Sequence, residues 1–119
     1  MRWRNTMSED DTDRTAKVRA LNDKLRREVM GGQILITPGV AALGPEKVVH
    51  IWETVARFET FTEDNDPHGE HDFGSFEFEG ASVLRKIDYY DSSLEFGSDD
   101  PADPDKTTRV LTILLSEEY

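Results

Sequence analysis

The chain has 119 residues, of which 33% are charged and 36% hydrophobic, and its formal net charge is −11. This length fits one domain around a single core. The chain has no cysteine, which excludes a disulfide framework, a thiolate zinc site and a cysteine nucleophile. No apolar run approaches the length of a membrane span and no secretory signal precedes the first acidic residues, so we expect a cytoplasmic protein without membrane contact.

Charge is distributed unevenly along the chain. Residues 1–31 contain eight Lys or Arg and six Asp or Glu, whereas residues 32–119 contain six and nineteen, a net charge of −13. A body this acidic repels phosphate backbones, so we expect no direct binding to nucleic acid. It suits a basic protein partner, a divalent cation, or mimicry of a nucleic acid, although acidic surfaces most often serve solubility alone.

The N-terminal part of the chain predicts a disordered lead and then a helix. Residues 1–12 are polar and acidic with nothing to bury, so a single α+β domain is expected over residues 13–119. The helix is predicted over residues 15–30, and its apolar residues form one stripe: Val18, Leu21, Leu25 and Val29. Two glycines at positions 31 and 32 then end it. We expect the basic opposite face of this helix to dock within the chain.

The rest of the chain predicts an α+β fold. Its expected elements are a strand at 33–37, a helix at 44–61, a β-hairpin with strands at 76–79 and 83–90, and a strand at 109–116. The last strand is apolar on both faces, which is typical of a central, covered strand. We predict a mainly antiparallel sheet of about four strands with two helices packed on one face.

The stretch 64-DNDPHGEHDFG-74 concentrates polar side chains and suggests a divalent-metal site. The candidate metal ligands are Asp64, Asp66, His68 and His71. The stretch opens like a calcium loop, but the twelfth position holds Ser75 where such a loop needs a bidentate glutamate. Two histidines at this spacing converge only in a helix, and the intervening proline and glycine oppose one. A divalent metal is therefore the one cofactor suggested, and none is certain.

The same stretch suggests acid–base catalysis. A histidine beside carboxylates can titrate near neutral pH, which makes Glu70, His71 and Asp72 candidate catalytic residues. Tyr90 joins these candidates if its strand pairs with the strand that follows the stretch. No nucleophile elbow, phosphate loop or zincin helix accompanies them. Whether the protein is an enzyme therefore stays open.

A purely structural explanation competes with both chemical ones. Asp-Asn-Asp-Pro is a turn sequence, in which side chains accept hydrogen bonds from the amides that follow. On this interpretation His71 or Asp72 ties the loop to the sheet. The acidic segment 99-DDPADPD-105 is likewise either a partner-binding loop or a solvated turn.

Six segments occur along the chain in this order: 19-RALNDKLRR-27, 31-GGQILITPGVAALGPE-46, 64-DNDPHGEHDFGSFE-77, 86-KIDYYD-91, 100-DPADP-104 and 107-TTRVLTILLSEEY-119. Together, over about residues 16–119, they resemble a bacterial family of small proteins, domain of unknown function 3768. The resemblance implies a single-domain cytoplasmic protein, mostly alphaproteobacterial and often carried on plasmids and other mobile elements. It implies no activity. An aromatic residue is also familiar in the family where this chain has His68, which argues against that histidine as an obligatory ligand.

Two hypotheses for function follow. The first is a small acidic binding or regulatory protein of plasmids or mobile elements, which inhibits a basic host protein acting on nucleic acid and so opposes host defence. The second is a small metal-dependent or acid–base enzyme that uses the cluster at residues 64–72. The sequence does not fix the oligomeric state.

Overall fold

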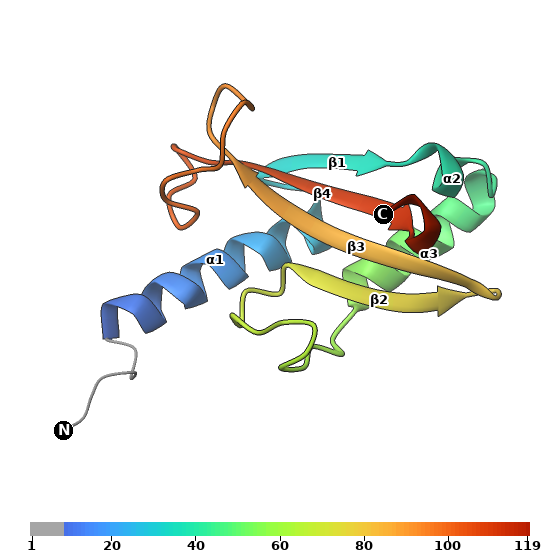
Figure 1. Cartoon of the computed structure of the whole chain (residues 1–119), viewed down its shortest axis with the longest axis horizontal. Helices are drawn as coiled ribbons and strands as arrows, with labels where there is room; N and C mark the ends of the chain where they lie inside the picture. The colour runs from blue at the N-terminus through green and yellow to red at the C-terminus, as the bar shows by residue number, and fades with distance from the viewer. Residues whose placement is uncertain (1–8) are drawn as a thin grey trace.

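The computed structural model describes residues 9–119 and contains one four-stranded sheet with helices behind it (Figure 1). The helices are α1 (Glu9–Glu28), α2 (Pro38–Ala41), α3 (Pro45–Arg57) and the 3-10 turn η1 (Ser116–Glu118). The strands are β1 (Gly32–Ile36), β2 (Phe73–Phe78), β3 (Ala81–Tyr90) and β4 (Thr108–Leu115). Within the described part of the chain, every helix is too short or too polar to cross a membrane.

The strand order is β1-β4-β3-β2, with β1 parallel to β4 and the other pairs antiparallel. This confirms the predicted α+β fold with about four strands and two main helices, and the parallel pair is a minor difference. Hydrophobic alternation shows which residues face the core but not the direction of pairing, so it could not reveal that the first strand lies beside the last. The hairpin turn at Glu79 and Gly80 has φ angles of 50° and 85°, as a two-residue type I′ turn requires.

The core lies between the sheet and the two long helices. Leu111 and Ile113 of the central strand β4 are 0% and 1% exposed, and they pack in one cluster with Ile51 and Val55 of α3 and Leu25 of α1. On the other face of β4, Val110 and Leu114 are also buried. The prediction of a central strand covered on both faces is therefore confirmed. The second helix is also present, although it ends at Arg57 rather than at residue 61.

The first helix differs from its prediction at both ends. It begins at Glu9, so part of the expected lead is helical, while residues 1–8 lie outside the described residues. It ends at Glu28, and Val29 rather than a glycine takes the first left-handed conformation, with a φ angle of 58°. Val29 is consequently 56% exposed and leaves the buried stripe. Only part of the basic face docks within the chain: Arg26 is fully buried and Arg19 half-buried, whereas Lys17, Lys24 and Arg27 are exposed.

Candidate functional site

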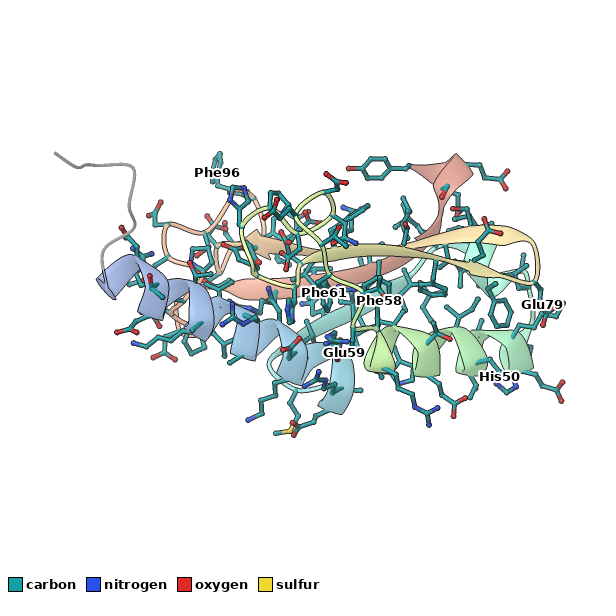
Figure 2. All side chains as sticks on the ribbon, turned by 90° about the horizontal axis from the view of Figure 1, so that it is seen from below. His50, Phe58, Glu59, Phe61, Glu79 and Phe96 are labelled. Carbon is teal, nitrogen blue, oxygen red and sulfur yellow. The ribbon has the colours of Figure 1, made fainter. Side chains whose placement is uncertain are left out.

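The loop between α3 and β2 carries the polar stretch 64–74 and lies against one side of α1. Arg19 Nη1 donates to the carbonyl of Gly69 at 2.9 Å, and Asn22 Nδ2 donates to the carbonyl of Glu70 at 3.0 Å. Phe61, from the start of the same loop, points into the layer between helices and sheet, beside Phe58 (Figure 2). Helix and loop, about 50 residues apart in sequence, are thus joined directly.

Asp66 organises the loop from within. Its side chain is 5% exposed, and its Oδ1 accepts hydrogen bonds from the backbone N–H groups of Glu70 at 2.9 Å and His71 at 3.1 Å. These bonds support His71 in a left-handed conformation, with a φ angle of 58°, that non-glycine residues seldom adopt. Asp66 therefore caps the turn, as the structural interpretation of this stretch predicts.

His71 pairs with a residue that sequence reasoning did not single out. Its Nδ1 lies 3.0 Å from Oδ1 of Asp23 on α1, its Nε2 lies 4.0 Å from Oδ2 of Asp66, and its ring stacks on Phe61 with a centroid separation of 3.9 Å. Burial alone would raise the pKa of Asp23, but hydrogen bonds from His71 and Arg26 hold it below its usual value. The result is a histidine–carboxylate pair of the kind that acid–base chemistry uses, although a flat ring contact closes one face of the imidazole.

Of the four candidate metal ligands, only Asp66 and His71 approach each other, at 4.0 Å. Asp64 and His68 are exposed, Asp66 is committed to the turn, and His71 faces Asp23. Over residues 9–119, no group of three or more His, Cys, Asp or Glu side chains is arranged to hold a metal ion. The divalent-metal hypothesis therefore receives no geometric support.

Glu70 belongs to a second, buried network that reaches the middle of the sheet. Tyr89 donates its hydroxyl to Glu70 Oε1 at 2.7 Å and accepts a hydrogen bond from Asn22 at 2.8 Å. Asn22 Oδ1 accepts in turn from Arg109 Nε at 2.9 Å. Burial, and then the hydrogen bond to Glu70, raise the pKa of Tyr89 far above its ordinary value.

Tyr90, the tyrosine chosen from sequence, lies on the opposite face of the sheet from Tyr89. The expected pairing of its strand with the strand after the stretch is present, but Tyr90 does not point toward the loop, and its neighbour Tyr89 contacts Glu70 instead. The signal that could have identified this network is Asn22, an amide placed one turn from Val18 on the apolar stripe of α1. Asp72 makes no side-chain hydrogen bond within the described chain, and burial, followed by the charge of Glu70, raises its pKa.

A different region gathers exposed carboxylates. The first turns of α1 and the loop between β3 and β4 lie at the same end of the molecule (Figure 1), and Arg14 joins them through a 2.7 Å ion pair with Asp100. We call this region the acidic end and define it by five exposed residues: Asp11, Asp13, Glu95, Asp99 and Asp105. A shallow pocket of about 260 Å³ opens there beside Arg14, Val18 and Pro101.

Some carboxylates of the loop between β3 and β4 only build turns. Asp91 Oδ1 accepts from the N–H and the hydroxyl of Ser93, and Asp103 Oδ1 accepts from the N–H of Asp105 at 2.9 Å. By contrast, the carboxylates of Glu95, Asp99 and Asp105 make no hydrogen bond in the described part of the chain. The loop is thus ordered by these turn bonds, and its remaining carboxylates are exposed to solvent.

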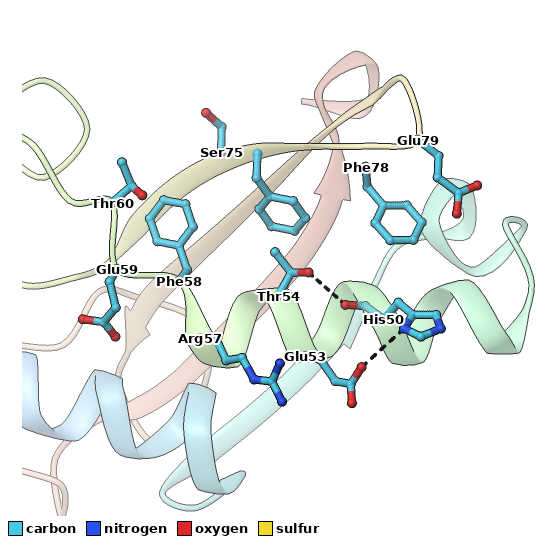
Figure 3. Close-up of a pocket in the computed structure, with 11 residues that line it drawn as sticks. His50, Glu53, Thr54, Arg57, Phe58, Glu59, Thr60, Ser75, Phe78 and Glu79 are labelled. Atoms are coloured by element: carbon cyan, nitrogen blue, oxygen red, sulfur yellow. Dashed lines mark hydrogen bonds and ion pairs between the residues drawn. The ribbon is translucent and has the colours of Figure 1, made fainter.

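A groove lies between α3 and the edge strand β2 (Figure 3). It encloses about 810 Å³ over an aromatic floor of Phe58, Phe76 and Phe78. The carboxylates on its rim are paired locally: Glu79 with Lys47 at 2.9 Å and Glu53 with His50 at 3.4 Å, while Glu59 pairs with Arg26 and Arg27. Such a groove can hold apolar groups, but none of the predicted catalytic residues lines it.

One family model matches the chain, and its description is "Protein of unknown function (DUF3768)", over residues 36–118. The chain belongs to the DUF3768 family. No curated protein and no solved structure matches it. The DUF3768 segment contains α3, the polar loop, the groove and most of the acidic end. It does not contain α1, which supplies Asp23, Asn22 and Arg26 to the buried networks.

Proposed function

We propose that this DUF3768 protein is a small acidic binding protein that engages a basic region of a protein partner through its acidic end. The observation that carries the proposal is the placement of positive charge inside the fold. Arg26, Arg85 and Arg109 are 0%, 0% and 1% exposed. Because these three cations count toward the formal net charge of −11, the solvent-facing surface is more negative than that value.

The acidic end supports a specific mode of action. Carboxylates from the start of α1 and from the 91–106 loop are held on ordered backbone by turn bonds and by the Arg14–Asp100 ion pair. Ordered negative charges attract a basic partner from a distance and compete with a phosphate backbone for its cationic site. The narrower form of the proposal is an inhibitor of a basic nucleic-acid-acting host protein that acts in the cytoplasm. Its origin on a plasmid or another mobile element is part of the proposal only because the family resemblance implies it.

A competition experiment tests this proposal. A panel of basic DNA-binding repressors and nucleases is each bound to a labelled DNA duplex, and the purified protein is titrated in at low and at moderate salt. The proposal predicts displacement of DNA from at least one panel member, weakening as salt screens the charges. Displacement from none of them at low salt would contradict it.

The His71–Asp23 pair favours a second candidate, an acid–base enzyme of unspecified substrate that uses Glu70, His71 and Asp72. The substitution His71→Gln, which removes the imidazole ring, distinguishes this enzyme from the binding protein. A hydrolytic or isomerase activity found with the wild-type protein and abolished in this variant, with the fold intact, would favour the enzyme. Unchanged activity in this variant would show that His71 is not part of a catalytic site.

A further inference from the structure

The strand β1 forms one edge of the sheet and pairs on one side only, with β4 (Figure 1). The backbone N–H of Thr37 donates to the carbonyl of Ile113 at 3.1 Å, which fixes the direction in which successive residues of this strand face. By alternation, Ile34 and Ile36 direct their N–H and C=O groups away from β4. The free edge therefore presents unpaired backbone donors and acceptors.

The sequence around this edge lacks the usual protection against pairing. Between Glu28 and Glu46 the chain has no charged residue, although 33% of all its residues are charged. The same segment supplies four exposed apolar side chains, in order of sequence Val29 at 56%, Met30 at 51%, Leu35 at 51% and Ile36 at 39%. Proteins commonly block an open edge with lysine, proline or a bulge, and Gly32–Ile36 contains no lysine or proline.

The opposite edge of the sheet is protected in the expected way. Strand β2 carries the exposed Glu77 and is followed by Glu79, so a second copy that approached this edge would meet like charge. The acidic end repels a second copy for the same reason. The stretch around β1 is therefore a part of the described chain where two molecules of such high negative charge can meet with few facing carboxylates. One of them, Glu118, lies beside the end of the strand and accepts hydrogen bonds from Thr37 and Gly39.

We propose that two copies of the chain associate by antiparallel pairing of their β1 strands, so that the sheet continues from one copy into the other. In a two-fold register centred on Ile34, this residue faces its own counterpart and Ile36 lies opposite Gly32. A Cβ atom at Gly32 would stand 2.6 Å from the carbonyl oxygen of Arg109, so this position must remain glycine. The space beside this glycine is filled by Arg109 and Leu25, so Ile36 of the second copy would pack over these two residues.

This inference is independent of the proposed function, because β1 shares no residue with the acidic end. A protein that dimerises but binds no basic partner would contradict the proposed function alone. A monomer that binds a basic partner would contradict this inference alone. The dimer would also carry two acidic ends, which would raise the avidity for a partner with two basic regions.

Sedimentation equilibrium of the full chain tests the inference. The expected result is a mass of twice 13.6 kDa that dissociates on dilution, with tighter association at higher salt because salt screens the repulsion between the copies. Ile36→Pro removes an N–H that faces outward, without removing a bond to β4, and should raise the dissociation constant by about tenfold or more. Leu35→Lys places a charge at the same edge and should act in the same direction.

Two matched variants control for the substitutions themselves. Ser75→Pro removes an outward N–H from the other edge strand, because Phe78 and Ala81 close the hairpin as a bonded pair and Ser75 therefore faces outward. Phe96→Lys places a charge on a side chain that is 69% exposed and projects from the surface (Figure 2). Both should leave the dissociation constant unchanged.

Amide hydrogen exchange identifies the strand directly. On dimerisation, exchange at Ile34 and Ile36 should slow in a concentration-dependent way, whereas Gln33 and Leu35, already bonded to β4, should change little. A monomer at all concentrations would overturn the inference. The inference would also be overturned if Ser75→Pro or Phe96→Lys dissociated the dimer and both Leu35→Lys and Ile36→Pro left it intact. If Ile36→Pro fails to fold, Leu35→Lys decides the question, since its side chain is half exposed.

Discussion

Two equally buried arginines should respond very differently to the same substitution. Arg26 and Arg85 are both 0% exposed and both approach the ring of Phe61, with guanidinium carbons at 5.2 Å and 5.6 Å from its centroid. Methionine has a similar length and no charge, so it tests what each guanidinium contributes. The two sites differ in how many of the buried nitrogen atoms have partners.

Every nitrogen atom of the Arg26 guanidinium has a hydrogen-bond partner. Its Nη1 donates to the carbonyls of Val55, Ala56 and Phe58 at the end of α3, and its Nε donates to Asp23 at 2.9 Å. The end of one helix is thus capped by a cation from another. Removing one member of a buried ion pair typically costs about 3–5 kcal/mol, so Arg26→Met should lower the free energy of unfolding by about this amount.

Only one of the three guanidinium nitrogen atoms of Arg85 has a hydrogen-bond partner within the described residues. Its Nη2 donates to the carbonyl of His71 at 2.8 Å, but Nε and Nη1 have no hydrogen-bond partner within the described residues. Burial, and then repulsion by Arg26, lower the pKa of Arg85 to about 10, so the folded state carries a desolvated cation at pH 7. Replacing such a group by an apolar one is often neutral, and Arg85→Met should change stability by no more than about 1 kcal/mol.

Urea unfolding of both variants at pH 7, followed by far-UV circular dichroism, measures the difference. The expected order is wild type and Arg85→Met close together, with Arg26→Met well below both. A loss at Arg85 as large as the loss at Arg26 would refute the reasoning, because it would mean that the two nitrogen atoms have strong partners in solution. A neutral Arg26→Met would refute the capping role.

Three further substitutions follow from single contacts. Gly74→Ala should cost about 1–3 kcal/mol, because its Cβ would lie 2.6 Å and 2.7 Å from ring carbons of Phe58. Tyr89→Phe should cost about 1–3 kcal/mol through two lost hydrogen bonds, whereas Tyr90→Phe should be silent. Asp72 has a raised pKa, so its protonated form stabilises the folded state below pH 3.8 and this contribution is lost as the pH rises; Asp72→Asn should therefore unfold at higher urea than wild type at pH 7, with no difference in acid.

The same unfolding assay checks all three, with Gly97→Ala as the control for added volume, since its Cβ would meet nothing closer than 3.8 Å. Equal losses for the two glycine variants would contradict the close approach of Phe58. A loss for Tyr90→Phe equal to that for Tyr89→Phe would contradict the assigned faces of β3. A destabilised Asp72→Asn at pH 7 would mean that the carboxylate has a favourable partner.

Hydrophobic periodicity was enough to predict the second helix and the central strand. The stripe containing Ile51 and Val55 has one helical period, and the run around Leu111 is apolar on both faces, so each pattern has one structural solution. The edge position of β1 and its parallel pairing could not be predicted, because they depend on a contact between residues such as Ile36 and Ile113, far apart in sequence. Local propensity has no information about such a partner.

The sequence identified polar residues of the candidate site but not how they are arranged in space. Asp66 capping the turn follows from Asp-Asn-Asp-Pro alone. The partner of His71 is Asp23, 48 residues away, and no spacing within the stretch indicates it. Alternation placed Tyr89 and Tyr90 on opposite faces, yet which face meets the loop depends on the packing of α1. Three buried arginines run against the usual exposure of that residue and were not expected.

The most direct test of the central claim is the affinity of a basic partner for two charge-neutralised variants. One variant changes three carboxylates of the acidic end: Glu95→Gln, Asp99→Asn and Asp105→Asn. The matched control removes the same charge elsewhere: Glu28→Gln, Glu63→Gln and Glu117→Gln. Titration calorimetry against the panel member displaced from DNA should show a loss of affinity of about tenfold or more for the first variant and a much smaller loss for the second. Equal losses would show that net charge alone attracts the partner, and that the acidic end is not the binding site.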